Sequence, residues 1–378
     1  MAADVAVNEG ALAHPVAACR AATLTGVDGA AYTGGRFIVK CPGAHSTFCS
    51  RIGGSRKMKK RLSFALLLSG LLLSLSASPA AVEYKIVTAS ERGTYIKIGR
   101  NLAQFVAPAA DISLQALSSA GSVDNVRRLR YEPGVKFALV QSDVYQAFLD
   151  MASSGNAEAS ALIKPLRVIM PLYNEEIYFI VRADSERNFI HEIRNARINA
   201  GELGSGTALT SATLYRLMFG EAMPEGRTTY LSNEEALVKL VTDKSVDVVA
   251  VVAGQPAKLL VDMTPEARQH IKLLKFDPGH SSSRAVLRTY FQATVRAAHY
   301  PSLLAVDLTG LAVKALLVTY DFQVKDTEGA LRRFARSLCQ NFATLQEKGH
   351  PKWREVELAL PDLGRGWSYY GPTAAELR

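Results

Sequence analysis

Short apolar runs alternate with segments whose apolar residues recur every three or four positions, from about residue 82 to residue 276. Each apolar run has the length of a strand, and a helical pattern follows most of them. This alternation predicts an α/β fold with a largely parallel sheet. The expected strands cover residues 85–89, 112–117, 135–140, 197–200, 228–231 and 246–253, and the clearest helices cover 95–105 and 209–219.

The expected strands form two sets, separated by a long extended stretch over residues 166–182 that runs through Pro171. We expect this stretch to cross from one lobe to a second, and residues 271–276 to provide the return crossing. The division is then lobe I over 82–175, lobe II over 176–275, and a return to lobe I with C-terminal helices over 276–378. The apolar run 306–320 is expected to be a helix too short to span a membrane.

The last helical pattern is amphipathic. Its apolar face either packs in the core, which we favour, or forms a groove for a partner. The residues of that face are Leu331, Phe334, Leu338, Phe342 and Leu345.

Residues 58–81 have the three regions of a secretory signal peptide. Met58 precedes three basic residues, an apolar run over 62–75 follows, and small residues at 77–81 suit cleavage near Ala80 or Ala81. An uncleaved anchor would need about 20 apolar residues, and this run ends too early. The sequence therefore predicts export to the periplasm.

Residues 1–57 precede this complete signal and show no helical or strand period. We interpret Met58 as the initiator and residues 1–57 as an upstream start that is not structured; the alternative is a regulatory extension. Residues 1–57 carry six Lys/Arg and three Asp/Glu, and the signal adds three basic residues, so the net charge falls from +9 to +3 for residues 82–378. A basic nucleic-acid-binding face is therefore not expected. Only Cys339 remains in that part of the chain, which excludes an internal disulfide.

Polar residues follow the expected strands where each strand gives way to a helix. Ligands bind at this edge of an open α/β sheet, because first-turn N–H groups lack intrahelical partners and the helix dipole is positive there. Hydroxyl groups in one such turn are more often plain helix caps, but several turns meeting in one cleft favour an anionic ligand. The candidate ligand-binding residues are Thr94, Tyr95, Ser122, Gln141, Ser142, Ser205, Gly206 and Thr207, with Tyr173 at the crossing and Gln255 at a strand end as further candidates.

Known catalytic and cofactor motifs are not found in the sequence. Gly201 and Gly206 have P-loop spacing, but Thr207 stands where the phosphate-binding lysine belongs. The histidines after residue 82 are scattered without metal-ligand spacing. Glu175 and Glu176 are adjacent on an expected strand, so they point to opposite faces, and we expect a solvated charge pair. The sequence predicts no catalytic residue, no metal site and no cofactor.

Four segments together resemble the TAXI-type solute receptors of tripartite (TRAP) transporters. They are 88–95 with Ile98 and Gly99, 119–125, 139–143 and 197–207, and the resemblance extends from about residue 82 to 276. It implies a type II periplasmic-binding-protein fold, with two lobes joined by two crossing segments that close on an organic acid or an acidic, glutamate-like amino acid. It also implies delivery of the ligand to TRAP membrane subunits, and we expect a monomer.

The chain departs from the family pattern at Glu91 and Arg92, where small residues and glycine are usual, and at Ile96 and Lys97. Arg92 would either pair with a ligand carboxylate or lie in solvent. Two other functions stay open: a periplasmic sensor module of a signalling system, and an enzyme that uses the 201–207 loop on a phosphorylated substrate.

Overall fold

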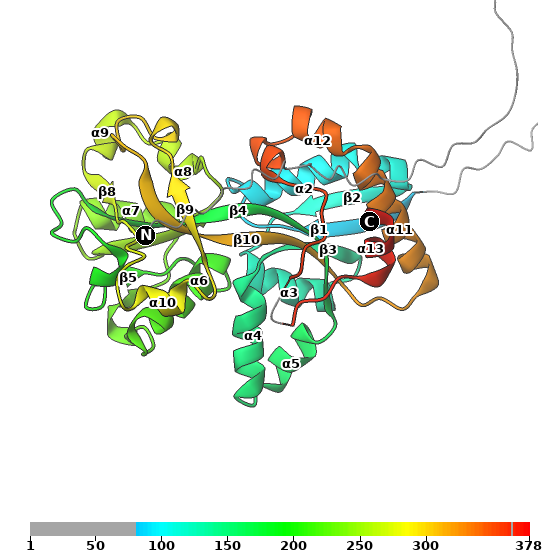
Figure 1. Ribbon diagram of the computed structural model, residues 1–378, viewed down its shortest axis with the longest axis horizontal. Coiled ribbons are helices and arrows are strands. Elements are labelled where there is room, and N and C mark those ends of the chain that lie inside the picture. The colour runs from blue at the N-terminus through cyan, green and yellow to red at the C-terminus, as the bar shows by residue number, and fades with distance from the viewer. Residues whose placement is uncertain (1–80, 364–365) are drawn as a thin grey trace, which may run out of the picture. The chain divides into compact units, whose positions relative to one another are not determined.

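The computed structural model describes residues 81–363 and 366–378. The predicted upstream extension and nearly all of the predicted signal peptide lie outside the described residues. Residues 82–378 contain a ten-stranded sheet with the order β2-β1-β3-β10-β4-β7-β5-β6, with β8 beside β4 and β9 beside β10. One end of this sheet belongs to a first lobe and the other end to a second (Figure 1).

The first lobe begins with a βα alternation close to the one predicted. Strand β1 pairs in parallel with both β2 and β3, and helices follow each of the three strands. The elements are β1 (Val82–Val87), α2 (Thr94–Phe105), η1 (Pro108–Ala110), β2 (Ile112–Leu117), α3 (Ser122–Tyr131), β3 (Val135–Gln141), α4 (Asp143–Ser153) and α5 (Ala157–Ile163).

Two long antiparallel strands connect the lobes. Strand β4 (Leu166–Arg182) confirms the predicted first crossing. Strand β10 (Leu308–Tyr320) pairs with β3 in the first lobe, with β4 along its length, and with β9 in the second lobe. The prediction of a helix over 306–320 is therefore wrong. The run is largely apolar because β10 is buried on both faces, and such a run does not distinguish a strand from a helix.

The second lobe repeats the alternation, and β5 pairs in parallel with β6 and β7. The predicted return crossing at 271–276 is wrong, because β8 pairs with β4 inside this lobe and β10 makes the return. The elements are η2 (Ile190–Glu192), β5 (Ile198–Asn199), α6 (Gly206–Phe219), η3 (Glu225–Arg227), β6 (Thr228–Thr229), α7 (Asn233–Val241), β7 (Val248–Ala253), α8 (Lys258–Val261), α9 (Pro265–Arg268), β8 (Ile271–Leu273), α10 (Ser283–Val286), β9 (Phe291–Val295) and η4 (Ala297–His299).

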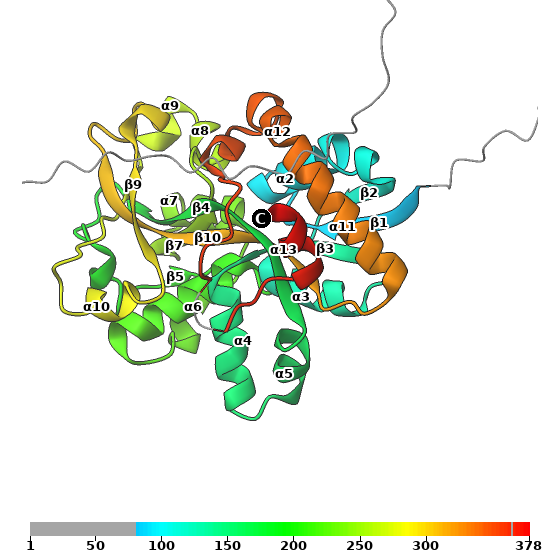
Figure 2. The ribbon, with the colours of Figure 1, turned by 45° about the vertical axis from the view of Figure 1, so that its right-hand side comes forward.

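The C-terminal segment returns to the first lobe as α11 (Lys325–Gln340), α12 (Phe342–Lys348), η5 (Pro351–Glu355) and α13 (Gly371–Leu377). Helices α11 and α13 lie side by side, as Figure 2 shows. Leu331, Phe334, Leu338 and Leu345 are fully buried, and Phe342 packs against the same cluster. The prediction of core packing for this face is confirmed.

Apolar residues form two buried clusters in each lobe, one on either side of the sheet region. The second lobe's clusters include Val286, Tyr290, Val295 and Tyr300, so that lobe extends well past residue 275. Among the helices of the described residues, none is long and apolar enough to cross a membrane.

Candidate functional site

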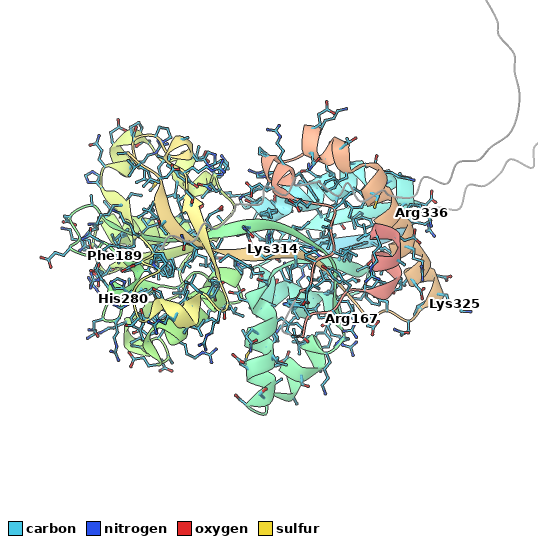
Figure 3. All side chains as sticks on the ribbon, viewed as in Figure 1. Arg167, Phe189, His280, Lys314, Lys325 and Arg336 are labelled. Atoms are coloured by element: carbon cyan, nitrogen blue, oxygen red, sulfur yellow. The ribbon has the colours of Figure 1, made fainter. Side chains whose placement is uncertain are left out.

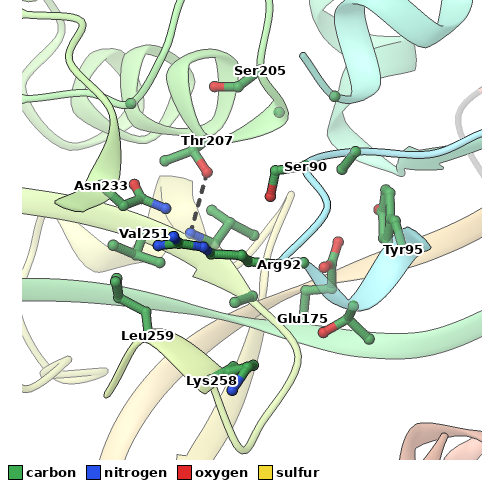
Figure 4. Close-up of a pocket in the computed structure, with 18 of the residues that line it drawn as sticks. Ser90, Arg92, Tyr95, Glu175, Ser205, Thr207, Asn233, Val251, Lys258 and Leu259 are labelled. Carbon is green, nitrogen blue, oxygen red and sulfur yellow. Dashed lines mark hydrogen bonds between the residues drawn. The ribbon is translucent and has the colours of Figure 1, made fainter. Parts of the chain in front are cut away.

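A cavity of about 860 Å³ lies between the lobes, at the ends of the strands where the sequence predicts ligand binding. The first lobe lines it with the loop 89–95, the turn 120–122, Gln141 and Glu175. The second lobe contributes the loop 201–207, the start of α7, and the ends of β7 and α8. Figure 4 shows Ser205 and Thr207 on one wall and Ser90, Tyr95 and Glu175 on another. Ligand pockets of small-molecule binding proteins are commonly of this size.

Four helices begin at the cavity wall: α2 and α3 from the first lobe, and α6 and α7 from the second. Gly93 and Gly121 occupy the N-cap positions of α2 and α3 without a side-chain cap. At α6, Ser205 caps the helix by accepting from the Ala208 N–H at 3.0 Å. Because the first N–H groups of a helix lack intrahelical acceptors and carry partial positive charge, these ends favour an anion.

The starts of α3 and α6 touch one another across the cavity. The Asp124 N–H donates to the Gly204 carbonyl at 3.2 Å. A Cβ atom on Gly206 would lie 1.7 Å from Gln141 Oε1 and 2.9 Å from Ser122 Oγ, so a larger residue would displace the Gln141 side chain from this contact. The Ser122 hydroxyl accepts from the Gln141 N–H at 3.1 Å, which ties α3 to the end of β3. The lobes are therefore in contact, as in a closed binding protein.

A second inter-lobe contact is buried beside the cavity. Asp143, the first residue of α4, is 2 % exposed, and its Oδ2 atom accepts hydrogen bonds from Thr210 and Tyr290 of the second lobe. Its Oδ1 atom is buried without a partner. Burial raises the pKa of the Asp143 carboxyl to about 6, although the two hydroxyl donors oppose this rise.

Glu175 is a buried carboxyl group in the cavity wall. It lies on β4 and is 5 % exposed. Burial raises the pKa of Glu175 to about 7, while Tyr95 and Lys352 lower it and Glu176 and Asp143 raise it further. The prediction of a solvated Glu175–Glu176 pair is wrong, because β4 is covered on both faces where the two residues lie. Glu175 and Glu176 have different partners, in agreement with the prediction that the two side chains point to opposite faces of the strand.

Glu176 belongs to a polar cluster behind the cavity wall. Lys352 Nζ lies 3.5 Å from Glu176 and 2.7 Å from Glu355. The Gln255 N–H donates to Glu176 at 2.7 Å, and the Gln255 side chain bonds to Thr294 and Arg296. Lys352 also lies 5.6 Å from the centre of the Tyr173 ring. This cluster joins the C-terminal segment to the crossing strand.

Seven of the ten predicted site residues line the cavity, and three do not. Gln255 is held by the cluster around Glu176, Tyr173 is fully buried beside Lys352, and the Ser142 carbonyl accepts from the Trp367 indole at 3.2 Å. These three follow or lie within strands as predicted, but they are not among the residues that line the cavity. The seven that line it are Thr94, Tyr95, Ser122, Gln141, Ser205, Gly206 and Thr207.

Several charged side chains that line the cavity are in ion pairs. Arg92 of the first lobe donates to Glu234 of the second at 2.9 Å, and both are largely exposed. Lys258 pairs with Asp262, and Glu91 pairs with Arg100. The Arg92 side chain is 77% exposed, which agrees with the predicted position in solvent, and it also joins the two lobes through Glu234.

The sequence interpretation missed Glu175, Asn233 and His350 as cavity residues. The sequence feature that could have indicated Glu175 as a site residue is a pair of carboxylates inside a largely apolar strand of 17 residues. Burial lowers the pKa of His350 to about 4, so its imidazole is neutral at pH 7. His350 lies after α12, and no local motif marks it.

Two histidines expected to be scattered lie together: the rings of His191 and His280 stack at 3.8 Å, with Phe189 on the other side of His191. Figure 3 places Phe189 and His280 on the second lobe and Lys314 between the lobes. In the described part of the chain, no group of three or more His, Cys, Asp or Glu residues is arranged to hold a metal ion.

Two α/β lobes joined by a pair of crossing strands, with a cavity between them, define the fold of a periplasmic binding protein. The chain belongs to the NMT1-like family, whose model matches residues 86–360.

Solved structures of similar fold include the periplasmic binding protein BugD, with 14% identity, coverage of 72% of this chain and 84% of that one, and a TM-score of 0.43. A Xanthomonas citri protein bound to ATP shares 12% identity over 78% of this chain and 96% of that one, with a TM-score of 0.45. A binding-protein component of an ABC phosphonate transporter from Pseudomonas aeruginosa shares 13% identity over 70% and 80%, with a TM-score of 0.40. Similarities of this size do not specify a ligand.

Proposed function

We propose that the protein is an extracytoplasmic solute-binding receptor without catalytic activity. It captures a small carboxylate or an acidic amino acid by closure of its lobes. The observation that carries this proposal is the meeting of the α3 and α6 N-termini at the cavity, through Gly206, Ser122 and Gln141. A carboxylate placed there receives N–H and hydroxyl donors from both lobes, and some of those donors converge only when the lobes close.

Neutral donors suit a receptor that spends part of its time empty. An unpaired buried cation would be costly in an empty cleft, whereas helix N-termini and hydroxyl groups carry only partial charge. Of the cations that line the cavity, Arg92 and Lys258 are paired with carboxylates, whereas Lys97 is in no ion pair of the described residues. At the starts of α3 and α6, recognition of the anion rests on backbone and hydroxyl donors.

We also propose that the receptor is exported to the periplasm and delivers its ligand to the membrane subunits of a TRAP-type transporter. The signal-like segment 58–81 supports the first part, and the four TAXI-like segments support the second. The two lobes offer a membrane partner a surface that changes on closure.

A thermal-shift screen of carboxylates, amino acids and phosphates tests the binding function, because a ligand that binds only the folded state raises its melting temperature. We expect stabilisation by carboxylates or acidic amino acids. Stabilisation by sugar phosphates or nucleotides alone would contradict the proposal and favour an enzyme. Ligand uptake by proteoliposomes that contain the candidate TRAP membrane subunits, with and without the receptor, tests the transport role.

A further inference from the structure

Adjacent carboxyl groups on β4 have very different surroundings. Glu176 has a cation, because Lys352 Nζ lies 3.5 Å from it and is itself 1 % exposed at its side chain. No ion pair of the described residues includes Glu175, which faces the cavity on the opposite side of the strand. A buried carboxylate without a positive partner is unfavourable. A positively charged group of a ligand would therefore be stabilised at this position.

Tyr95 marks the same place. Its side chain is 4 % exposed and lines the cavity, and its hydroxyl group lowers the pKa of the Glu175 carboxyl. Figure 4 shows Tyr95 and Glu175 on the same wall of the cavity. A buried carboxyl group and a buried hydroxyl group together in the wall of a cavity indicate a polar part of the ligand.

The cavity wall therefore has two parts of opposite character. The starts of α3 and α6 present donors and partial positive charge, whereas Glu175 presents an acceptor and negative charge. A dicarboxylate would satisfy the first part and bring a second negative charge toward Glu175, and like charges at short distance in a buried site are strongly unfavourable.

We propose that Glu175 binds a positively charged amino group of the ligand, so that the ligand is an amino acid and not a simple carboxylic acid. The ammonium group lies at Glu175 and Tyr95, and a carboxylate lies at the starts of α3 and α6. This inference rests on the proposed receptor function and specifies the class of its ligand.

Proton release follows from the same arrangement. Four titratable groups act on Glu175: Tyr95 and Lys352 stabilise its charged form, whereas Glu176 and Asp143 oppose it. With burial they leave the empty site with a pKa of about 7, so part of the Glu175 population is protonated at pH 7. An ammonium group favours the carboxylate, and binding at pH 7 should therefore release protons.

Isothermal titration of matched ligand pairs tests the proposal on the purified protein. The probes are L-glutamate with glutarate, L-aspartate with succinate, and L-leucine with 4-methylpentanoate, which differ only in the amino group. We expect one amino acid to bind at least 100-fold more tightly than its partner. Glu175→Gln should weaken binding of that amino acid 10- to 100-fold, because the glutamine oxygen can still accept a hydrogen bond but no longer carries the charge that strengthens it, and should leave the affinity of its partner within about threefold.

Glu158→Gln is the matched control, since Glu158 lies on α5 and pairs only with Arg127 at the surface. It should bind every probe like the parent. Titrations of the parent in two buffers of different ionisation enthalpy measure the released proton, and this readout does not depend on the folding of any variant.

The possible failures are distinguishable. Equal affinity for an amino acid and its deaminated partner, with no proton release, would overturn the role of Glu175 and leave a carboxylate receptor. If no probe of either kind binds, the receptor function proposed above falls as well.

Discussion

Thr210 of the second lobe donates a hydrogen bond of 2.6 Å to Asp143 of the first lobe, and both residues are buried. Tyr290 donates to the same oxygen at 3.0 Å. The lobes are thus held closed by a buried contact that involves no ligand. Opening must break these bonds and hydrate the carboxyl group, so this contact contributes to the balance between open and closed states.

Asp143→Ala should shift that balance toward the open state. Removing one partner of a buried hydrogen bond costs about 1–3 kcal/mol, and the affinity of any ligand bound by the closed form should fall roughly 10- to 100-fold. Asp150→Ala is the control, because Asp150 joins Arg216 across the lobes in an exposed ion pair worth about 0–1 kcal/mol. Isothermal titration measures both. Unchanged affinity for Asp143→Ala, with a lowered melting temperature, would assign Asp143 a purely structural role.

Gly206→Ala should block closure while leaving the helix intact. The added Cβ would overlap Gln141 and approach Ser122 in the opposite lobe, whereas alanine suits the first turn of α6. We expect ligand affinity to fall at least tenfold without loss of stability. Gly226→Ala in the same lobe meets nothing within 4 Å and should bind normally. Small-angle scattering with ligand present should show the Gly206 variant remaining open.

Ser205→Ala and Thr207→Ala should separate capping from ligand binding. Ser205 caps α6, so its loss should lower the free energy of unfolding by about 1 kcal/mol. Thr207 accepts from the Val252 N–H at 3.3 Å, which leaves its hydroxyl hydrogen free to bond a ligand. Its loss should reduce affinity roughly 10- to 100-fold. Equal changes in stability and affinity for the two variants, measured by urea unfolding and titration, would contradict this separation.

One contribution to the free energy of unfolding of the ligand-free protein should decrease as pH rises. Burial raises the folded-state pKa of Glu175 from 4.5 to about 7 and that of Asp143 from 3.8 to about 6. Between those values the unfolded chain has already lost the proton that the folded protein keeps, so unfolding becomes more favourable with pH, up to about pH 7.

Glu175→Gln removes the pH-dependent contribution of Glu175 to the free energy of unfolding, which is on the order of 3 kcal/mol. Carboxyl groups with lowered pKa values, such as Glu132 and Asp247, act in the opposite direction, so the variant must be compared with the parent. We expect urea unfolding to show the variant gaining stability relative to the parent between pH 5 and pH 8. A constant difference between the two would show that Glu175 is not buried as described.

The sequence allowed the βα units and seven of the residues that line the cavity to be predicted, because a strand, a small-residue turn and a helix start form a local pattern. The direction of a side chain at a strand end is not local, which is why Ser142 and Gln255 were placed in the cavity. Strand β10 was mistaken for a helix because it has strands on both edges and packs on both faces, so that most of its positions are apolar. Glu175 and Glu176 were assigned to solvent because their burial depends on residues distant in the sequence. Lys352, which lies 3.5 Å from Glu176, is 176 residues further along the chain, and the cavity that Glu175 faces is lined in part by the second lobe.

The central position of β10 has a consequence for how the chain acquires its structure. A chain that ends before Leu308 leaves β3 and β4 with open edges, so the first lobe's sheet is completed only after most of the polypeptide exists. Such long-range pairing slows folding. A polypeptide that is still unfolded can pass through a narrow translocation pore. Fragments ending near residue 300 should therefore be digested rapidly by proteases under conditions in which the full chain resists, and a resistant fragment would show that the first lobe forms without β10.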